Sequence, residues 1–127
     1  GGLMTTDVIS FRPEVTVDYI IKELRNKKPE PAELYTLFVT EENDKLVGTF
    51  DLRDLVVAEP ETTVKTIMRS DPVYLYDDQR IDDIAETISK YNLLAVPVVD
   101  QEKLLQGMVV VDDVIEDLIN KRRTNKR

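Results

Sequence analysis

The fold of this chain is decided by two neighbouring stretches, Tyr91-Asn92-Leu93-Leu94-Ala95-Val96-Pro97-Val98-Val99-Asp100 and Leu104-Leu105-Gln106-Gly107-Met108-Val109-Val110-Val111-Asp112-Asp113-Val114-Ile115. Each contains a short apolar run, rich in Val and Leu and bounded by turn or charged residues, which is typical of a buried strand. The second stretch then passes into a helix that opens on paired aspartates. The pattern predicts a strand, an acidic turn, a second strand and a helix.

That helix is predicted to be amphipathic. Its apolar positions recur at helical spacing, which places them on one face turned toward a core. The positions expected to face inward are Val110 or Val111, Val114, Ile115, Leu118 and Ile119. The acidic positions left for solvent are Asp112, Asp113, Glu116 and Asp117.

The first half of the chain carries the same order of elements as the second. In it we expect a lead-in, the segment that enters the repeat, over residues 3–7, followed by a strand over 8–11 and a helix over 17–26 capped by Thr16. Strands are expected over 34–40 and 46–50, on either side of an acidic turn. A short helix capped by Asp51 then runs through Val57, with Leu52, Leu55 and Val56 facing inward. The second half restarts with a lead-in over 64–69, a strand over 73–75 and a helix with Ile81, Ile84, Ala85 and Ile88 on its apolar face.

The two halves also align residue by residue. Met4 precedes Met68 by 64 positions, whereas Gly48 precedes Gly107 by 59, and the five extra residues lie around two prolines after the first long helix. The alignment predicts an α/β fold of two β-α-β-β-α repeats packed about a pseudo-twofold axis, since each copy is too small to bury its own sheet well. The expected division is residues 1–59, residues 60–120 and a basic tail over 121–127, which we expect to be disordered.

Composition excludes several classes of function. The 127 residues include no cysteine and no histidine, which excludes disulfides, thiol nucleophiles, zinc–thiolate sites and the commonest general base. The net charge of −8 disfavours nucleic acid and anionic lipid and favours cations or basic partners, although it also serves plain solubility. No apolar run approaches the ~18 residues of a membrane span, so no direct membrane insertion is expected. The opening Gly1-Gly2 suggests an excised fragment or a cloning remnant.

Taken together, the paired lead-ins, the striped helices, the Leu-x-Val-Pro-Val-Val-Asp strand and the Gly107 to Asp113 segment resemble a pair of CBS domains, a Bateman module. The resemblance runs from Met4 to about Ile119. More narrowly, the amino-acid sequence of residues 3–6, 52–55, 91–100 and 111–115 resembles that of the cytosolic CBS pair of MgtE-type magnesium transporters. This resemblance implies a non-catalytic cytosolic sensor attached to a transmembrane or N-terminal domain of the same parent chain, and a homodimer that meets through CBS helices.

The resemblance also implies that Mg²⁺ bound at acidic CBS surfaces holds the dimer compact. Asp113 and Glu116 match acidic positions of the family's metal-binding helix, with Asp112, Asp117 and Asn92 as lesser candidates. Mg²⁺ prefers oxygen ligands and is usually held by one or two carboxylates, which suits an acidic helix face. The alternative for the same residues is a solvated face whose first-turn aspartates favour the helix dipole. The basic tail departs from the family, in which acidic residues often follow, and leaves open a parent without a downstream pore.

An adenine nucleotide is the competing ligand. Many CBS pairs bind one through a Gly-x-x-[Ser/Thr]-x-x-Asp segment, and the resemblance assigns its terminal aspartate to Asp54 and to Asp113. The hydroxyl position, however, is Asp51 in one copy and Val110 in the other. A carboxylate at that position repels phosphate, and valine cannot donate to it. For Asp51 we expect the role of helix N-cap instead.

Overall fold

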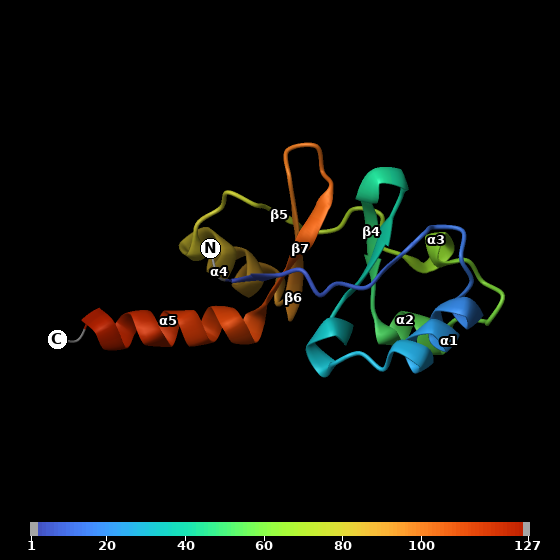
Figure 1. Cartoon of the computed structure of the whole chain (residues 1–127), viewed down its shortest axis with the longest axis horizontal. Helices are drawn as coiled ribbons and strands as arrows, with labels where there is room; N and C mark the ends of the chain where they lie inside the picture. Colours follow the sequence, from blue (N-terminus) through green and yellow to red (C-terminus); the bar gives the residue numbers. More distant parts are fainter. Residues whose placement is uncertain (1–2, 126–127) are drawn as a thin grey trace.

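The computed structural model describes residues 3–125, and side chains as far as Lys121. Two lobes lie side by side, each built on one sheet (Figure 1). One sheet has the strand order β1-β7-β6-β5, and the other has the order β2-β3-β4. The strands are β1 (Met4–Thr5), β2 (Ser10–Phe11), β3 (Leu37–Thr40), β4 (Leu46–Phe50), β5 (Leu75–Tyr76), β6 (Ala95–Val99) and β7 (Leu105–Val110).

Two of the helices, those that follow Thr16 and Asp51, begin where these predicted capping residues placed them. The helices are α1 (Val17–Lys27), α2 (Leu52–Val57), α3 (Val64–Ile67), α4 (Ile81–Tyr91) and α5 (Val111–Asn125), with short 3-10 turns η1 (Pro31–Leu34) and η2 (Glu42–Asp44). The Thr16 hydroxyl accepts a hydrogen bond from the Tyr19 amide at 3.2 Å, so it caps α1 as expected. Asp51 caps α2 in the same way, because its carboxylate accepts from the Asp54 amide at 3.0 Å. Within the described part of the chain, none of the helices has the combination of length and apolar character that a membrane crossing needs.

The strand pairings confirm the duplicated α/β fold. In the first lobe Val39 pairs with Gly48, and in the second Val98 pairs with Gly107, which are the residues equivalent at an offset of 59. The register shifts one position later in both lobes. The parallel pairs repeat as well, since β2 pairs with β3 and β5 with β6 in the same sense. The two lobes are therefore copies of one design.

Each half lends its lead-in to the sheet of the other half. Thr5 of β1 pairs with Met108 of β7, and its equivalent Arg69 pairs with Thr49 of β4. Figure 1 shows the blue N-terminal segment starting in the lobe of α4 before it crosses to the lobe of α1. Gly107 permits the close approach of β1, because a Cβ there would collide with the Thr5 carbonyl oxygen.

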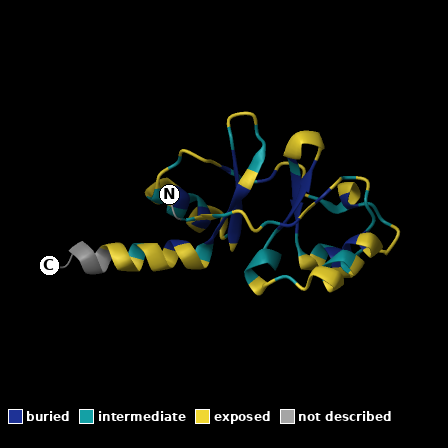
Figure 2. Ribbon diagram, in the orientation of Figure 1, coloured by how far each residue is buried: buried dark blue, intermediate teal, exposed yellow. Residues whose placement is uncertain are grey.

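The pseudo-twofold axis passes close to the pair Lys45 and Leu104. These residues occupy equivalent places in the two repeats, and they form an antiparallel bridge with each other. Around this bridge a shared core joins the halves, and it is composed of Phe38, Leu46, Ala95, Val99, Met108 and Val110. Figure 2 shows the buried residues concentrated on the strands that face one another across this axis. Burial of these side chains against one another stabilises the packing of the two sheets.

Two of the expected apolar stripes are wrong in part. In α2, Leu55 is 2% exposed as predicted, whereas Leu52 is 40% and Val56 is 79% exposed. In α5, Val114 is buried at 3%, but Ile115 and Ile119 are 51% and 45% exposed. Each helix packs against its own lobe through one narrow edge, so only the innermost positions are covered. Figure 2 shows α5 projecting from its lobe with most of its described surface in solvent.

The sequence also misplaced several element ends. The strand expected over 34–40 begins at Leu37, since Pro31–Leu34 forms a 3-10 turn first. The tail expected to be disordered is helical through Asn125, and residues 126–127 lie outside the described residues. Lys and Arg are good helix formers, and basic residues near a helix C-terminus favour its dipole, so α5 extends across them.

Candidate functional site

A cleft of about 420 Å³ opens between the two halves. The first half contributes residues 35–36, which follow η1, and residues at the end of β4, whereas the second half contributes the segment after α3, the loop from α4 into β6 and residues of β6. Its lining combines tyrosine, aliphatic and charged side chains, among them Tyr35, Thr49, Asp51, Arg69, Asp71, Tyr91, Asn92, Leu94 and Pro97. Apolar walls with a few polar groups at one end are typical of a small-molecule site.

The polar end of this cleft is organised around Arg69. Its guanidinium lies 3.7 Å from the Asp51 carboxylate and 3.5 Å from that of Asp54. The two aspartates also form a reciprocal capping box, in which the Asp54 carboxylate accepts from the Asp51 amide at 2.9 Å. Asp54 is thus occupied by the cap and by Arg69, and it is not among the residues that line the cleft.

The charges that line the cleft do not favour a bare phosphate. Asp51 and Asp71 face it together with a single cation, Arg69, among the lining residues. A divalent ion bound to the phosphates neutralises part of their charge and so weakens their repulsion by the carboxylates. A nucleotide that carries such an ion therefore fits this lining better than a free anion.

The pseudo-twofold axis relates this cleft to a second position, which is filled by side chains of the shared core. The counterparts of Thr49 and Asp51 at an offset of 59 are Met108 and Val110, and both are buried in the shared core. Tyr35 and Tyr74 pack against the same cluster. Asp113, the second aspartate assigned to a nucleotide from sequence, is exposed on α5 and does not line the open cleft.

Tyr35 connects the cleft to α5, the helix that carries Asp112, Asp113, Glu116 and Asp117 (the acidic helix). Its hydroxyl donates a hydrogen bond to the Asp112 carboxylate at 3.2 Å, across the boundary between the halves. The negative charge of Asp112 raises the pKa of the Tyr35 phenol above its ordinary value, and the hydrogen bond to the same carboxylate adds to the effect. Of the four acidic residues predicted on this helix, Asp112 is the one with a hydrogen-bond partner on the first half.

The other metal candidates lie apart from any closed cage. Asp113, Glu116 and Asp117 are exposed on α5. Asn92 ends α4 in the left-handed conformation with φ 53° and ψ 48°, which explains an asparagine at this position without a ligand. Within residues 3–121 no three acidic side chains gather closely enough to hold a metal ion. A carboxylate site for Mg²⁺ on this surface would therefore use only one or two side chains of a single copy.

Sequence reasoning missed most of the residues that line the cleft, among them Tyr35, Arg69 and Asp71. Tyr35 was assigned to a strand and Arg69 to the end of a lead-in, whereas Asp71 was assigned to no element. The signal that could have found Arg69 is the offset of 64, because it makes Arg69 the counterpart of Thr5 and places it beside the end of β4. No periodic pattern marks Tyr35 or Asp71.

Comparison with known proteins gives a consistent result. The family model described as CBS domain matches the chain twice, over residues 1–61 and 64–120. The chain is 38% identical over 118 residues to the magnesium transporter MgtE of Thermus thermophilus, and the match covers 93% of the chain. It is 37% identical, over 91% of its length, to the magnesium transporter MgtE of Enterococcus faecalis.

Solved structures agree with these relatives. The cytosolic domain of the Mg²⁺ channel MgtE in complex with ATP superposes with a TM-score of 0.87 at 37% identity, over 91% of this chain and 47% of that one. The soluble part of a magnesium transporter gives a TM-score of 0.88 at 32% identity, over 94% of this chain and 46% of that one. The chain spans about a quarter of the length of the curated transporters that it matches, 26% in both cases.

Proposed function

The chain belongs to the CBS domain family, and from that premise we propose that it is a non-catalytic regulatory module that senses Mg²⁺ for a magnesium transporter of the MgtE type. The observation that carries the proposal is the likeness to the transporter relatives over 93% of the chain at 38% identity. In this role the module lies in the cytosol as part of a longer parent chain. Residues 1–59 and 60–120 are its two repeats, with exchanged lead-ins.

The acidic face of α5 supplies the chemistry for Mg²⁺. Asp113 and Glu116 are three positions apart, so their carboxylates are neighbours on one exposed face. When such groups approach to ~4 Å they repel by about 4 kcal/mol at an effective dielectric near 20. A surface that brings them together is unstable without a cation and stable with one. Mg²⁺ then shifts the population toward the compact state.

A second copy of the chain supplies the missing half of that surface. Ile115 and Ile119 expose about half of their side chains on α5, at 51% and 45%, and Val56 on α2 is 79% exposed. Val56 and Ile115 are equivalent at an offset of 59, so the two repeats present matching apolar helix faces. Burial of such faces in a homodimer would bring the acidic residues of the partner close to α5.

The test is small-angle scattering and sedimentation in chelator and in millimolar Mg²⁺. A smaller radius of gyration for the dimer in Mg²⁺, with half-saturation in the millimolar range or below, is the expected result. Ca²⁺ at the same concentration is the control. It contributes the same ionic strength, but it is larger than Mg²⁺, which keeps its waters and demands octahedral geometry. Equal dimensions in chelator and in Mg²⁺ would refute the proposed switch.

The open cleft favours a second candidate function, the binding of an adenine nucleotide. The cleft has room for a small molecule at about 420 Å³, it has aromatic and aliphatic walls, and Arg69 lies at its polar end. A related cytosolic domain was solved in complex with ATP. Calorimetric titration with ATP and AMP, in the presence and absence of Mg²⁺, separates the two functions. Micromolar nucleotide binding with no response of the dimer to Mg²⁺ would make this the primary function.

A further inference from the structure

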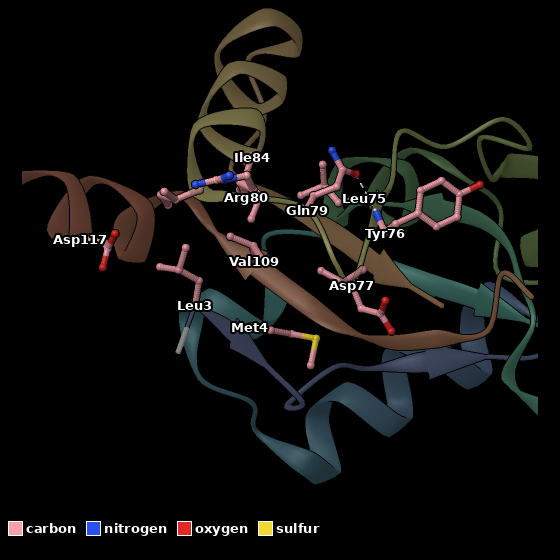
Figure 3. Close-up of a pocket in the computed structure, with 12 residues that line it drawn as sticks. Leu3, Met4, Leu75, Tyr76, Asp77, Gln79, Arg80, Ile84, Val109 and Asp117 are labelled. Carbon is pink, nitrogen blue, oxygen red and sulfur yellow. Dashed lines mark hydrogen bonds between the residues drawn. The ribbon is translucent and has the colours of Figure 1, made fainter. Parts of the chain in front are cut away.

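A second cleft, of about 460 Å³, lies at the outer end of the four-stranded sheet between α4, β1 and α5. Figure 3 shows its apolar floor, to which Leu3, Leu75, Ile84 and Val109 contribute, and its charged rim with Asp77, Arg80 and Asp117. It is separate from the cleft between the halves. No residue lines both.

The equivalent place in the first half is filled by the chain itself. There the segment that enters α3 lies against the start of α1, and Val64 is fully buried in a core with Phe11, Val17 and Ile20. Three of these neighbours of Val64 are the counterparts, at an offset of 64, of Leu75, Ile81 and Ile84, which line the 460 Å³ cleft.

Backbone hydrogen bonds fasten that segment in place. The Val64 amide donates to the Val15 carbonyl at 2.9 Å, and the Lys65 amide donates to the Pro13 carbonyl at 3.0 Å. In return, the amides of Val17 and Asp18 donate at 2.9 Å to carbonyls of the same segment, those of Thr62 and Pro60. The segment thus satisfies the first free N–H groups of α1 as well as covering its apolar face.

In the second half, no segment within residues 3–125 occupies the equivalent position against the start of α4. The counterparts of the Val17 and Asp18 amides are those of Ile81 and Asp82 at the start of α4, and no backbone bond to them from a segment of the described chain is found. Ile81 is partly exposed whereas Val17 is 1% exposed, and Ile84 is 8% exposed whereas Ile20 is 0%. Leu3 is the counterpart of Ile67, so the offset places the counterpart of Val64 one residue ahead of Gly1.

We propose that this cleft is the docking site for the polypeptide segment that immediately precedes Gly1 in the longer parent chain. The segment lies extended across the start of α4, exchanges backbone hydrogen bonds with residues 77–82, and inserts one apolar side chain where Val64 lies in the first half. The proposal depends on the module being part of a longer chain, but on neither Mg²⁺ nor nucleotide. The segment that enters the module is thereby held to α4, on the same lobe as the acidic helix.

The experiment compares amide hydrogen exchange in the 127-residue chain with that in two lengthened chains. One carries about ten of its own upstream residues, and the other carries a copy of residues 60–64, Pro-Glu-Thr-Thr-Val, directly ahead of Gly1. Both should slow exchange at the Ile81 and Asp82 amides by about tenfold or more, since docking adds a hydrogen bond to each. The amides of Val17 and Asp18 are the internal reference, and they should not change.

A matched control replaces the last residue of the copied segment, Val, with Asp. This control should leave exchange at Ile81 and Asp82 within about twofold of the 127-residue chain, because a carboxylate is not tolerated on an apolar floor. Unchanged exchange with the native upstream residues would overturn the proposal. Equal protection by the Val and Asp versions would also overturn it, since the cleft would then play no part. Neither result bears on the Mg²⁺ response, which is measured separately.

Discussion

The phenol of Tyr35 donates a hydrogen bond to the carboxylate of Asp112 at 3.2 Å, although the two residues lie 77 positions apart. The bond joins the residue that directly follows η1 in the first half to the first turn of α5 in the second. It also breaks the pseudo-twofold symmetry, since the counterparts of Tyr35 and Asp112 are Leu94 and Arg53, which cannot form it. One end of the open cleft and one end of the acidic helix are therefore connected on one side of the module only.

The first prediction concerns the titration of Tyr35. Asp112 raises the pKa of this phenol above its ordinary value of 10.0, chiefly through the repulsion between the two negative charges. The folded protein thus favours the neutral phenol. This contribution to stability is fully present below pH 10 and is lost as the pH rises through the raised pKa. In Asp112→Asn the pKa of Tyr35 should fall toward 10, as measured by NMR on ¹³Cζ-labelled tyrosine. Glu86→Gln on α4 is the control, and an equal fall in that variant would contradict the assignment.

The second prediction concerns the acidic helix. The double variant Asp113→Asn with Glu116→Gln should reduce the Mg²⁺-induced rise in melting temperature by several degrees, since a ligand at about one hundred times its dissociation constant stabilises by about 2.7 kcal/mol. Without metal, the variant dimer should already be compact. The matched control, Asp18→Asn with Glu23→Gln on α1, removes the same charge. If the control reduces the response equally, bulk charge rather than a site on α5 explains it.

Much of the fold could be predicted from the sequence because the physics is local or repeated. Thr16 and Asp51 have side chains that cap helices, and both do so. The offsets of 64 and 59 predicted which residues are equivalent, and the paired bridges Thr5–Met108 and Arg69–Thr49 follow that equivalence. In a duplicated sequence, a residue that recurs at equivalent positions in both copies, such as Gly48 and Gly107, indicates a position that the fold constrains, even without a structure.

The remainder depends on contacts that no local pattern encodes. Periodicity identified an apolar stripe on α5, but it could not tell that Ile115 faces solvent, because the width of the covered edge depends on how the lobes pack. Likewise, the hydrogen bond from Tyr35 to Asp112 and the ion pairs of Arg69 join residues that are distant in sequence or carry no periodic signal. The site residues named from the sequence therefore rested on resemblance rather than on spacing, and of them Asn92 lines the cleft between the halves.

The third prediction concerns the exposed apolar face. If a second copy covers α5, Ile115→Lys should weaken the homodimer by at least tenfold, because it replaces an apolar contact with a strongly hydrated ammonium group on the face that the second copy covers. Sedimentation equilibrium measures the change. Ile115→Leu keeps the face apolar, and its dimer should remain close to that of the unmodified chain. A Lys variant that dimerises normally would show that this helix lies outside the interface.

The fourth prediction concerns the cleft between the halves. Asp51→Ser restores a hydroxyl at the end of β4 and removes a negative charge, and serine can still cap α2. ATP should bind about tenfold more tightly, equivalent to about 1.4 kcal/mol of relieved repulsion. Calorimetry measures the affinity. The control is Asp7→Ser, which removes the same charge from a residue that does not line the cleft. Unaltered affinity in Asp51→Ser would place the nucleotide elsewhere or exclude it.

The fifth prediction compares the two equivalent glycines. A Cβ at Gly107 would collide with the backbone carbonyl oxygen of Thr5, whereas at Gly48 it would mainly meet the flexible side chain of Met68 and come within 3.0 Å of the Arg69 carbonyl oxygen. A methionine can move aside, but a paired strand cannot. Gly107→Ala should therefore lower the free energy of unfolding by about 3 kcal/mol, and Gly48→Ala by about 1 to 2 kcal/mol. Urea denaturation measures both. The reverse order would mean that β1 detaches from β7 more easily than Met68 moves, and that the exchanged lead-in contributes little to stability.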